Sequence, residues 1–189
     1  MRIRLILSCR VNYFSDKVER KLEKYHSKRR RKHIQRERAG VEQAEHAHHN
    51  RVLWLDGEEK KYVTEVGAMN MAFVIDGTVV TPELDGSILR GITRDSAIKV
   101  LKANGYAVEE RKVGIDEIVK AAHDGKLDEA FGTGTAAVIS PVGEISYKGE
   151  NIVINGGKMG AVTQWLYDRI TGIQRGKYAD DFGWVYAVE

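Results

Sequence analysis

The sequence predicts an α+β domain built on a mixed β-sheet with packed helices. Three features support this fold class: short apolar runs that end in turn signals, helical segments that alternate with them irregularly, and several hairpin signals. A regular alternation of strands and helices would instead indicate a doubly wound parallel sheet. The 189 residues, 42% hydrophobic and 30% charged, are sufficient for one sizeable core.

The first regular segments predict strands. Residues 51–55 form a short apolar run that ends in an Asp-Gly pair, which indicates a strand followed by a turn. Residues 71–75 and 78–81 flank Asp76 and Gly77, and this pair tolerates the positive φ angles of a two-residue hairpin. We therefore expect a strand and then a hairpin.

Helical spacing of apolar residues follows in three segments. Thr93 is expected to cap a first helix that stops at Asn104 and Gly105, where a left-handed residue can end a helix. Residues 115–122 predict a second helix. Residues 160–174 predict a third, because their apolar side chains recur on one side at helical spacing.

Strands are predicted between these helices. Residues 106–113 alternate in polarity as a strand at the edge of a sheet does. Residues 131–142 and 144–147 are predicted to pair with each other around a Pro-Val-Gly turn. This irregular order of strands and helices is the reason for expecting a mixed sheet.

The net charge of +3 conceals a division of the chain. Residues 1–50 contain 14 Lys and Arg against 6 Asp and Glu, whereas residues 51–189 contain 16 against 21. Asymmetry of this size is typical of two pieces with different roles. We therefore expect a basic segment at 1–50, poorly ordered or helical, followed by a folded domain at 51–189.

Composition also excludes several classes of protein. The chain has no run of about 18 apolar residues, so no membrane partner is expected, and residues 1–7 lack the apolar centre of a secretory signal. Cys9 has no second cysteine for a disulfide. The group His46, His48 and His49 lacks further ligands at metal-site spacing. We expect a soluble, cytoplasmic protein without a metal.

Three short segments are candidates for binding a small charged ligand. Residues 91–96 place a glycine directly before a helix start, whose free N–H groups favour an anion. Residues 131–137 alternate glycine with threonine, and two such glycines could bend the backbone into an anion-binding nest. Residues 64–70 hold Glu65 beside a strand. Each pattern alone is common, because most helix starts bind water and most such turns and glutamates are structural.

In this order and spacing, the segments resemble the C-terminal domain of the class IV pyridoxal-phosphate aminotransferases, and specifically the branched-chain amino-acid aminotransferases. The resemblance covers about residues 51–189. The motifs that carry it are Val52-Leu-Trp-Leu-Asp56, Glu65-Val-Gly-Ala-Met-Asn70, Val80-Thr-Pro82, Leu89-Arg-Gly-Ile-Thr-Arg-Asp95, Glu129-Ala-Phe-Gly-Thr-Gly-Thr-Ala136 and residues 180–184. Several separate motifs agree in type and order, so the match is specific.

The resemblance implies a role for each candidate residue. Glu65 would pair with the pyridine nitrogen of pyridoxal 5'-phosphate and keep the ring protonated. Ile92 and Thr93 would provide an amide and a hydroxyl to the cofactor phosphate, and Thr135 would add its hydroxyl. The amides of Thr135 and Ala136 would hold the α-carboxylate of the substrate. The implied reaction transfers the amino group of leucine, isoleucine or valine to 2-oxoglutarate.

The sequence departs from the family where the Schiff-base lysine should lie. In the family this lysine precedes the Val-Leu-Trp-Leu strand in a Lys-x-Gly-Gly-Asn-Tyr context. Counting back from Glu65 by the family's spacing reaches Arg29 and Arg30, and that context is absent. Lys28 and Lys32, within a run of like charges, lack the burial and orientation that a catalytic amine needs. We therefore expect no catalytic lysine, and a partial chain without the family's N-terminal domain.

The origin and function of the chain have alternatives. A shifted reading frame would explain the basic segment, because arginine and lysine codons can read as Gly-Gly-Asn in a neighbouring frame. A D-amino-acid aminotransferase or an aminodeoxychorismate lyase would share Glu65 and the anion nests, and so would an inactive remnant. No nucleic-acid partner is expected, because the basic segment lacks interleaved aromatic residues. The partners implied by the resemblance are amino acids, 2-oxo acids and a second copy in a homodimer.

Overall fold

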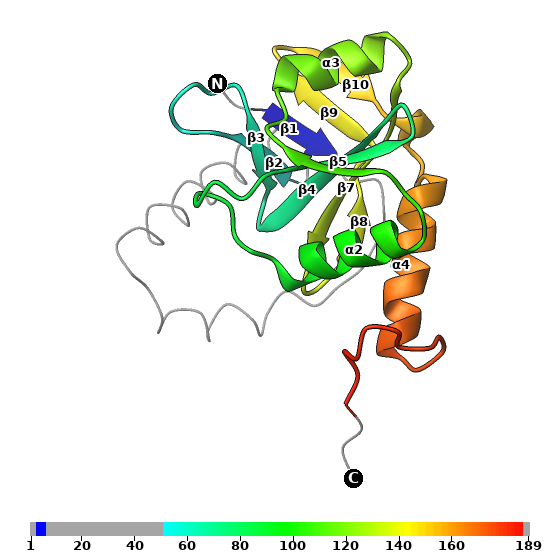
Figure 1. Cartoon of the computed structure of the whole chain (residues 1–189). Coiled ribbons are helices and arrows are strands. Elements are labelled where there is room, and N and C mark those ends of the chain that lie inside the picture. The colour runs from blue at the N-terminus through cyan, green and yellow to red at the C-terminus, as the bar shows by residue number, and fades with distance from the viewer. Residues whose placement is uncertain (1–2, 7–50, 187–189) are drawn as a thin grey trace, which may run out of the picture.

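The computed structural model describes residues 3–6 and 51–186 of the chain (Figure 1). Most of the predicted basic segment, with Cys9 and the histidine group, lies outside the described residues. The division predicted at residue 50 therefore stays a prediction. Residues 3–6 form a strand that pairs with strands of the later region.

The described strands form one ten-stranded sheet. In chain order they are β1 (Ile3–Ile6), β2 (Arg51–Leu55), β3 (Val63–Val66), β4 (Met69–Ile75), β5 (Thr78–Pro82), β6 (Val108–Arg111), β7 (Leu127–Gly134), β8 (Val138–Pro141), β9 (Glu144–Tyr147) and β10 (Glu150–Val153). The described helices are α2 (Ile92–Ala103), α3 (Ile115–His123) and α4 (Ala161–Gln174), with a 3-10 turn at Asn155–Gly157. The predicted α+β class is confirmed.

Strand β4 is the centre of this sheet. The order is β10-β9-β1-β2-β3-β4-β5-β6, and β7 joins it by pairing with β4 and β8. Strand β7 pairs along one edge of β4. The other edge of β4 pairs with β3 at its beginning and with β5 at its end. Among the described pairs only β5 and β6 are parallel, and α2 provides the crossover that a parallel pair requires. The sheet is therefore mixed, as predicted.

Two apolar clusters cover opposite faces of the strands, because alternate residues of β4 point to opposite sides. One cluster packs α3 and includes the fully buried Phe73 and Ile118. The other packs α2 and α4 and includes Leu101 and Leu166. Figure 1 shows α3 on one side and α2 and α4 on the other. Each such side chain contributes roughly 1.5–3 kcal/mol of burial energy, so these clusters hold the three described helices against the sheet.

Local turn chemistry confirms several predicted boundaries. Asp76 and Gly77 both have positive φ angles, 50° and 74°, and they join β4 to β5. Gly105, with φ of 81°, follows the end of α2, and Gly125, with φ of 68°, follows the end of α3. These turns depend on backbone angles that glycine adopts without a steric penalty.

The predicted cap of α2 is wrong. Thr93 lies inside the helix, and the capping position is Gly91, which makes no side-chain hydrogen bond to the helix. Gly91 has an extended backbone, and its carbonyl accepts the N–H of Asp95 at 3.0 Å. The first helical hydrogen bond therefore forms two residues before Thr93 could cap anything.

The predicted pairing around the Pro-Val-Gly turn is also wrong. Residues 131–142 are divided between β7 and β8, which pair with each other across the turn at 135–137. The left-handed φ of 57° at Val138 closes this hairpin. Strand β9 pairs with β10 and β1 instead. The Pro-Val-Gly segment only connects β8 to β9, because the earlier turn has already reversed the chain.

Glu129 fastens the start of α4 to β7. The N–H groups of Val162 and Thr163 donate to its two carboxylate oxygens at 2.8 Å each, and the Thr163 hydroxyl donates at 2.6 Å. A Cβ on Gly160 would lie 1.9 Å from the Glu129 Cδ, so this position requires glycine. A buried carboxylate of the protein therefore satisfies this helix terminus.

Candidate functional site

Three buried polar side chains form a row across β3, β4 and β7. Glu65 lies opposite Asn70, and Asn70 lies opposite Thr133. Residues directly opposite in antiparallel strands project to the same face of a sheet. Their exposed fractions are only 7%, 6% and 4%. Burying polar groups is costly unless they have partners, and the Thr133 hydroxyl of this row has none in the described structure, so the row is a candidate binding site.

Glu65 reaches the segment that leads into α2. The N–H of Leu89 donates to its Oε1 at 3.0 Å. A hydrogen bond to a charged group contributes about 1.5–3 kcal/mol. The indole of Trp54 donates to the carbonyl of Gly67 at 3.2 Å and supports the adjoining turn. The carboxylate is therefore held at a fixed place beside the start of α2.

The start of α2 presents backbone N–H groups. The first turn of a helix has N–H groups without helical partners, and Gly91 provides no side chain to satisfy them. Ile92 is 86% exposed and Thr93 is partly exposed. The positive end of the helix dipole adds to these donors. This terminus can hold an anion such as a phosphate.

Asn70 joins the two features. Its Nδ2 donates to the carbonyl of Leu89 at 2.8 Å. A Cβ on Gly91 would lie 2.1 Å from its Oδ1, so Gly91 permits a close approach that no other residue allows. Both backbone polar groups of Leu89 are thus bonded, one to Glu65 and one to Asn70.

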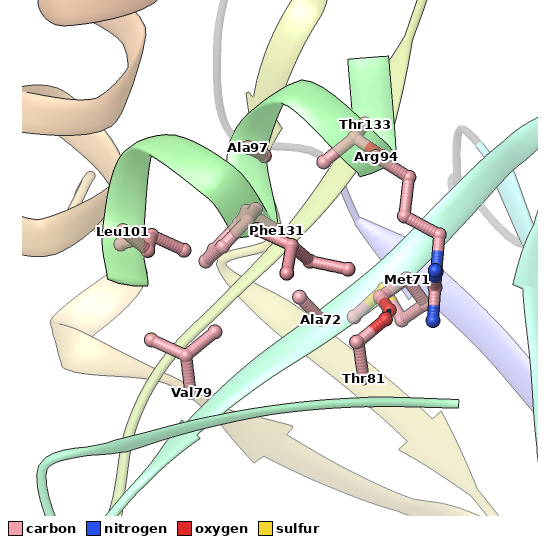
Figure 2. Close-up of a pocket in the computed structure, with 10 residues that line it drawn as sticks. Met71, Ala72, Val79, Thr81, Arg94, Ala97, Leu101, Phe131 and Thr133 are labelled. Atoms are coloured by element: carbon pink, nitrogen blue, oxygen red, sulfur yellow. Dashed lines mark hydrogen bonds between the residues drawn. The ribbon is translucent and has the colours of Figure 1, made fainter. Parts of the chain in front are cut away.

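Arg94 holds the same helix from beneath. It is 5% exposed, and its Nη2 donates to the carbonyl of Pro82 at 2.9 Å and to Glu110 at 3.1 Å. Figure 2 shows Arg94 beside Thr133, with its side chain extending toward Met71. These residues line a cavity of about 10 Å³, the size of one water. The cavity is a packing gap beneath the site and is too small for an organic ligand.

The turn between β7 and β8 carries Thr135 and Ala136, which are both exposed. It begins two residues after Thr133 and therefore lies at the same end of the sheet as the polar row. The prediction that the two glycines of residues 131–137 bend the backbone is wrong. Gly132 and Gly134 lie in β7, where added Cβ atoms would approach Met69 to 2.9 and 3.0 Å. These glycines make room for a side chain and do not bend the chain.

A larger hollow lies next to this site. It measures about 700 Å³ and is lined by residues 56–59, 62–64, 82–83 and 85–88 with Lys112. The predicted site residues do not line it, but residues 82–88 belong to the connection that ends at Leu89. Within residues 3–6 and 51–186, no cluster of potential metal ligands is present. The helices of this described part also include none that is long and apolar enough to cross a membrane.

The structure gathers the predicted site residues at one end of the sheet. Leu89 and Asn70 connect Glu65 to the helix start that holds Ile92 and Thr93, whereas Thr135 and Ala136 reach this end through β7. Three buried polar residues of this region, Asn70, Arg94 and Thr133, were not predicted from the sequence. Asn70 ends the Glu65 motif, which is a usable signal. No sequence signal marks Arg94 as buried, because arginine is usually exposed.

The chain is similar to proteins of one known family. The family model described as Amino-transferase class IV matches residues 17–145. Branched-chain-amino-acid aminotransferase 2 of Bacillus subtilis (strain 168) is 58% identical over 145 residues, which are 77% of this chain and 40% of that protein. A probable branched-chain-amino-acid aminotransferase of Staphylococcus aureus (strain N315) is 57% identical over 136 residues, 72% of this chain and 38% of that protein.

Solved structures show the same relationship. The branched-chain amino acid aminotransferase of Escherichia coli matches with a TM-score of 0.64 and 32% identity, over 76% of this chain and 44% of that chain. The T.th. enzyme of the same name, complexed with N-(5'-phosphopyridoxyl)-L-glutamate, matches with a TM-score of 0.65 and 31% identity, over 78% and 45%. The chain thus spans about 40% of the length of the curated relatives it matches. Because the family model covers more than half of it, the chain belongs to the class IV aminotransferases.

Proposed function

We propose that this chain is the cofactor-binding C-terminal part of a pyridoxal-phosphate-dependent branched-chain amino-acid aminotransferase. The observation that carries the proposal is the link between Glu65 and the start of α2 through Leu89. One connected segment thereby offers a carboxylate and an anion-binding helix terminus. The relatives' names support the branched-chain substrate class, because they are branched-chain aminotransferases at 57–58% identity.

The residues present fit pyridoxal 5'-phosphate. A buried carboxylate suits a protonated ring nitrogen, and a bare helix start suits the phosphate. The match to a structure complexed with N-(5'-phosphopyridoxyl)-L-glutamate supports the same cofactor. When bound, this cofactor supplies an electron sink for the α-carbon of the amino acid.

The proposed roles of the chain's own residues follow from their places. Glu65 keeps the ring nitrogen protonated. The amide at Ile92 and the hydroxyl of Thr93 anchor the phosphate, and the Thr135 hydroxyl adds to that anchor. The amides of Thr135 and Ala136 orient the substrate α-carboxylate. Within the complete enzyme, these contacts serve amino transfer from leucine, isoleucine or valine to 2-oxoglutarate. The family resemblance is also what supports a cytoplasmic homodimer as its working state.

Proton transfer at the α-carbon requires a lysine that the described residues do not provide. Every lysine between residues 51 and 186 is exposed, and the family's lysine context is absent from the sequence. We infer that this chain alone binds the cofactor without completing the transamination.

The test measures binding of pyridoxamine 5'-phosphate and of pyridoxamine by calorimetry. These amines form no imine with surface lysines, and they differ only in the phosphate. Glu65→Gln should weaken both ligands roughly ten- to hundredfold, the effect of one charged hydrogen bond. Thr93→Ala should weaken only the phosphorylated ligand, by a few fold. Glu58→Gln, in an exposed turn, is the matched control. Equal affinity of the unmodified chain for the two ligands would contradict the proposed phosphate site.

A further inference from the structure

We propose that Asn70 is a positioning residue that sets the spacing between Glu65 and the start of α2. The proposal rests on the proposed cofactor site for its functional meaning. The positioning contacts themselves involve only residues of this chain and need no ligand. Asn70 is 6% exposed and lies in the central strand β4, between Glu65 on β3 and Thr133 on β7.

The side-chain amide of Asn70 contacts two points of one segment. Its Nδ2 donates to the carbonyl of Leu89 at 2.8 Å. Its Oδ1 packs against Gly91, where a Cβ would lie only 2.1 Å away. The donor therefore fixes the residue after Ile88, and the oxygen limits how closely the helix start approaches the sheet.

Apolar burial is weak between Leu89 and the start of α2. Leu89 is 65% exposed and Ile92 is 86% exposed, so their side chains contribute little packing, whereas Ile88, before Leu89, is buried. The segment is held by polar contacts instead: the Leu89 N–H bonds to Glu65, and the Leu89 carbonyl bonds to Asn70. Loss of Asn70 leaves only one of these two contacts.

Arg94 anchors the other end of the same connection. It donates to the carbonyl of Pro82, where β5 ends, whereas Asn70 acts where α2 begins. Residues 83–91 are thus tied at both ends. Because the Pro82 anchor stays intact when Asn70 is replaced, such a replacement should loosen the Leu89–Gly91 end selectively.

Amide hydrogen exchange by NMR tests the positioning role without any ligand. Asn70→Ala should accelerate exchange of the Leu89 amide roughly tenfold, the effect of losing one buried hydrogen bond. Asn70→Asp keeps the volume and loses the donor, so it should act in the same direction and serves if the alanine variant does not fold. Asn104→Ala is the matched control, because Asn104 donates to the carbonyl of Val100 at the far end of α2. Unchanged exchange at Leu89 in both Asn70 variants would overturn the inference.

A second measurement tests the packing of Asn70 on Gly91. Gly91→Ala places its methyl group on Oδ1, whereas in the Asn70→Ala background that space is open. Gly91→Ala should therefore lower the melting temperature clearly in the unmodified chain and much less in the Asn70→Ala chain. Additive effects would show that the two residues do not contact each other.

Ligand binding then separates this inference from the proposed function. Asn70→Ala should reduce the preference for pyridoxamine 5'-phosphate over pyridoxamine roughly tenfold, and Asn104→Ala should not change it. A preference retained in full by Asn70→Ala overturns the positioning role. If the unmodified chain shows no preference, the proposed phosphate site is wrong, and the exchange result at Leu89 still decides whether Asn70 positions the segment.

Discussion

The contact between Glu129 and the start of α4 gives the sharpest prediction of stability. In Gly160→Ala the new Cβ would lie 1.9 Å from the Glu129 Cδ and 2.3 Å from Oε2. The carboxylate must move, and its bonds from the N–H groups of Val162 and Thr163 and from the Thr163 hydroxyl are then broken. The same move leaves the first turn of α4 without its cap.

The expected loss follows from the burial of this carboxylate. Glu129 is 7% exposed, and separating a buried charge from its partners costs about 3–5 kcal/mol. The free energy of unfolding of a typical domain is about 5–15 kcal/mol, so the substitution removes a large share of the stability. In urea, with a slope of about 1–3 kcal/mol per molar, this loss lowers the midpoint of unfolding by roughly 1–5 M.

Urea unfolding followed by circular dichroism measures this shift. Gly57→Ala is the matched control, because a Cβ there meets nothing within 4 Å. A midpoint for Gly160→Ala equal to that of Gly57→Ala would refute the placement of Glu129 under α4. In a Glu129→Ala background the clash is absent, so adding Gly160→Ala should change the midpoint little.

Three further predictions concern charge and the missing lysine. Burial alone would raise the pKa of Asp56, but backbone N–H groups of residues 59–62 donate to its carboxylate and lower the pKa from 3.8 to about 2. A carboxylate whose pKa is lower in the folded state stabilises the fold above its ordinary pKa of 3.8, and this effect is lost as the pH falls toward 2. The difference in unfolding free energy between the unmodified chain and Asp56→Asn, measured by urea titrations, should therefore shrink as the pH is lowered from 3.8 to 2. Arg94→Met should lower the unfolding free energy by about 1–3 kcal/mol, because the Pro82 carbonyl loses its donor, whereas Lys99→Met breaks an exposed ion pair and should cost about 0–1 kcal/mol in the same assay. Borohydride reduction with pyridoxal phosphate, followed by peptide mapping, should label no single lysine preferentially, and a stoichiometric adduct at one lysine would contradict the inferred loss of the catalytic amine.

Local signals predicted many elements because they act over a few residues. The hairpin at Asp76 and Gly77 and the stop at Gly105 depend on backbone angles that the residue type selects. The cap at Thr93 and the pairing around Pro-Val-Gly were wrong for the opposite reason. A glycine can begin a helix without a side-chain cap, and the partner of a strand depends on residues far away in the chain.

The candidate site shows the same division. Its predicted members, Glu65, Ile92, Thr93, Thr135 and Ala136, lie in motifs that a sequence displays, and their roles stay predictions until binding is measured. Their gathering at one end of the sheet follows from the pairing of β4 with β3 and β7. No sequence pattern states that pairing, because strands of similar composition can pair in several orders.

By itself the sequence determined the class of fold, most element boundaries and the motifs that resemble one family, because these depend on residue types and short spacings. Only the tertiary structure decided that Asn70 meets Leu89 and Gly91, that Arg94 lies beneath α2, and that Glu129 closes α4. These contacts join residues distant in the chain. They depend on strand register and on how the helices pack, which only the folded chain defines.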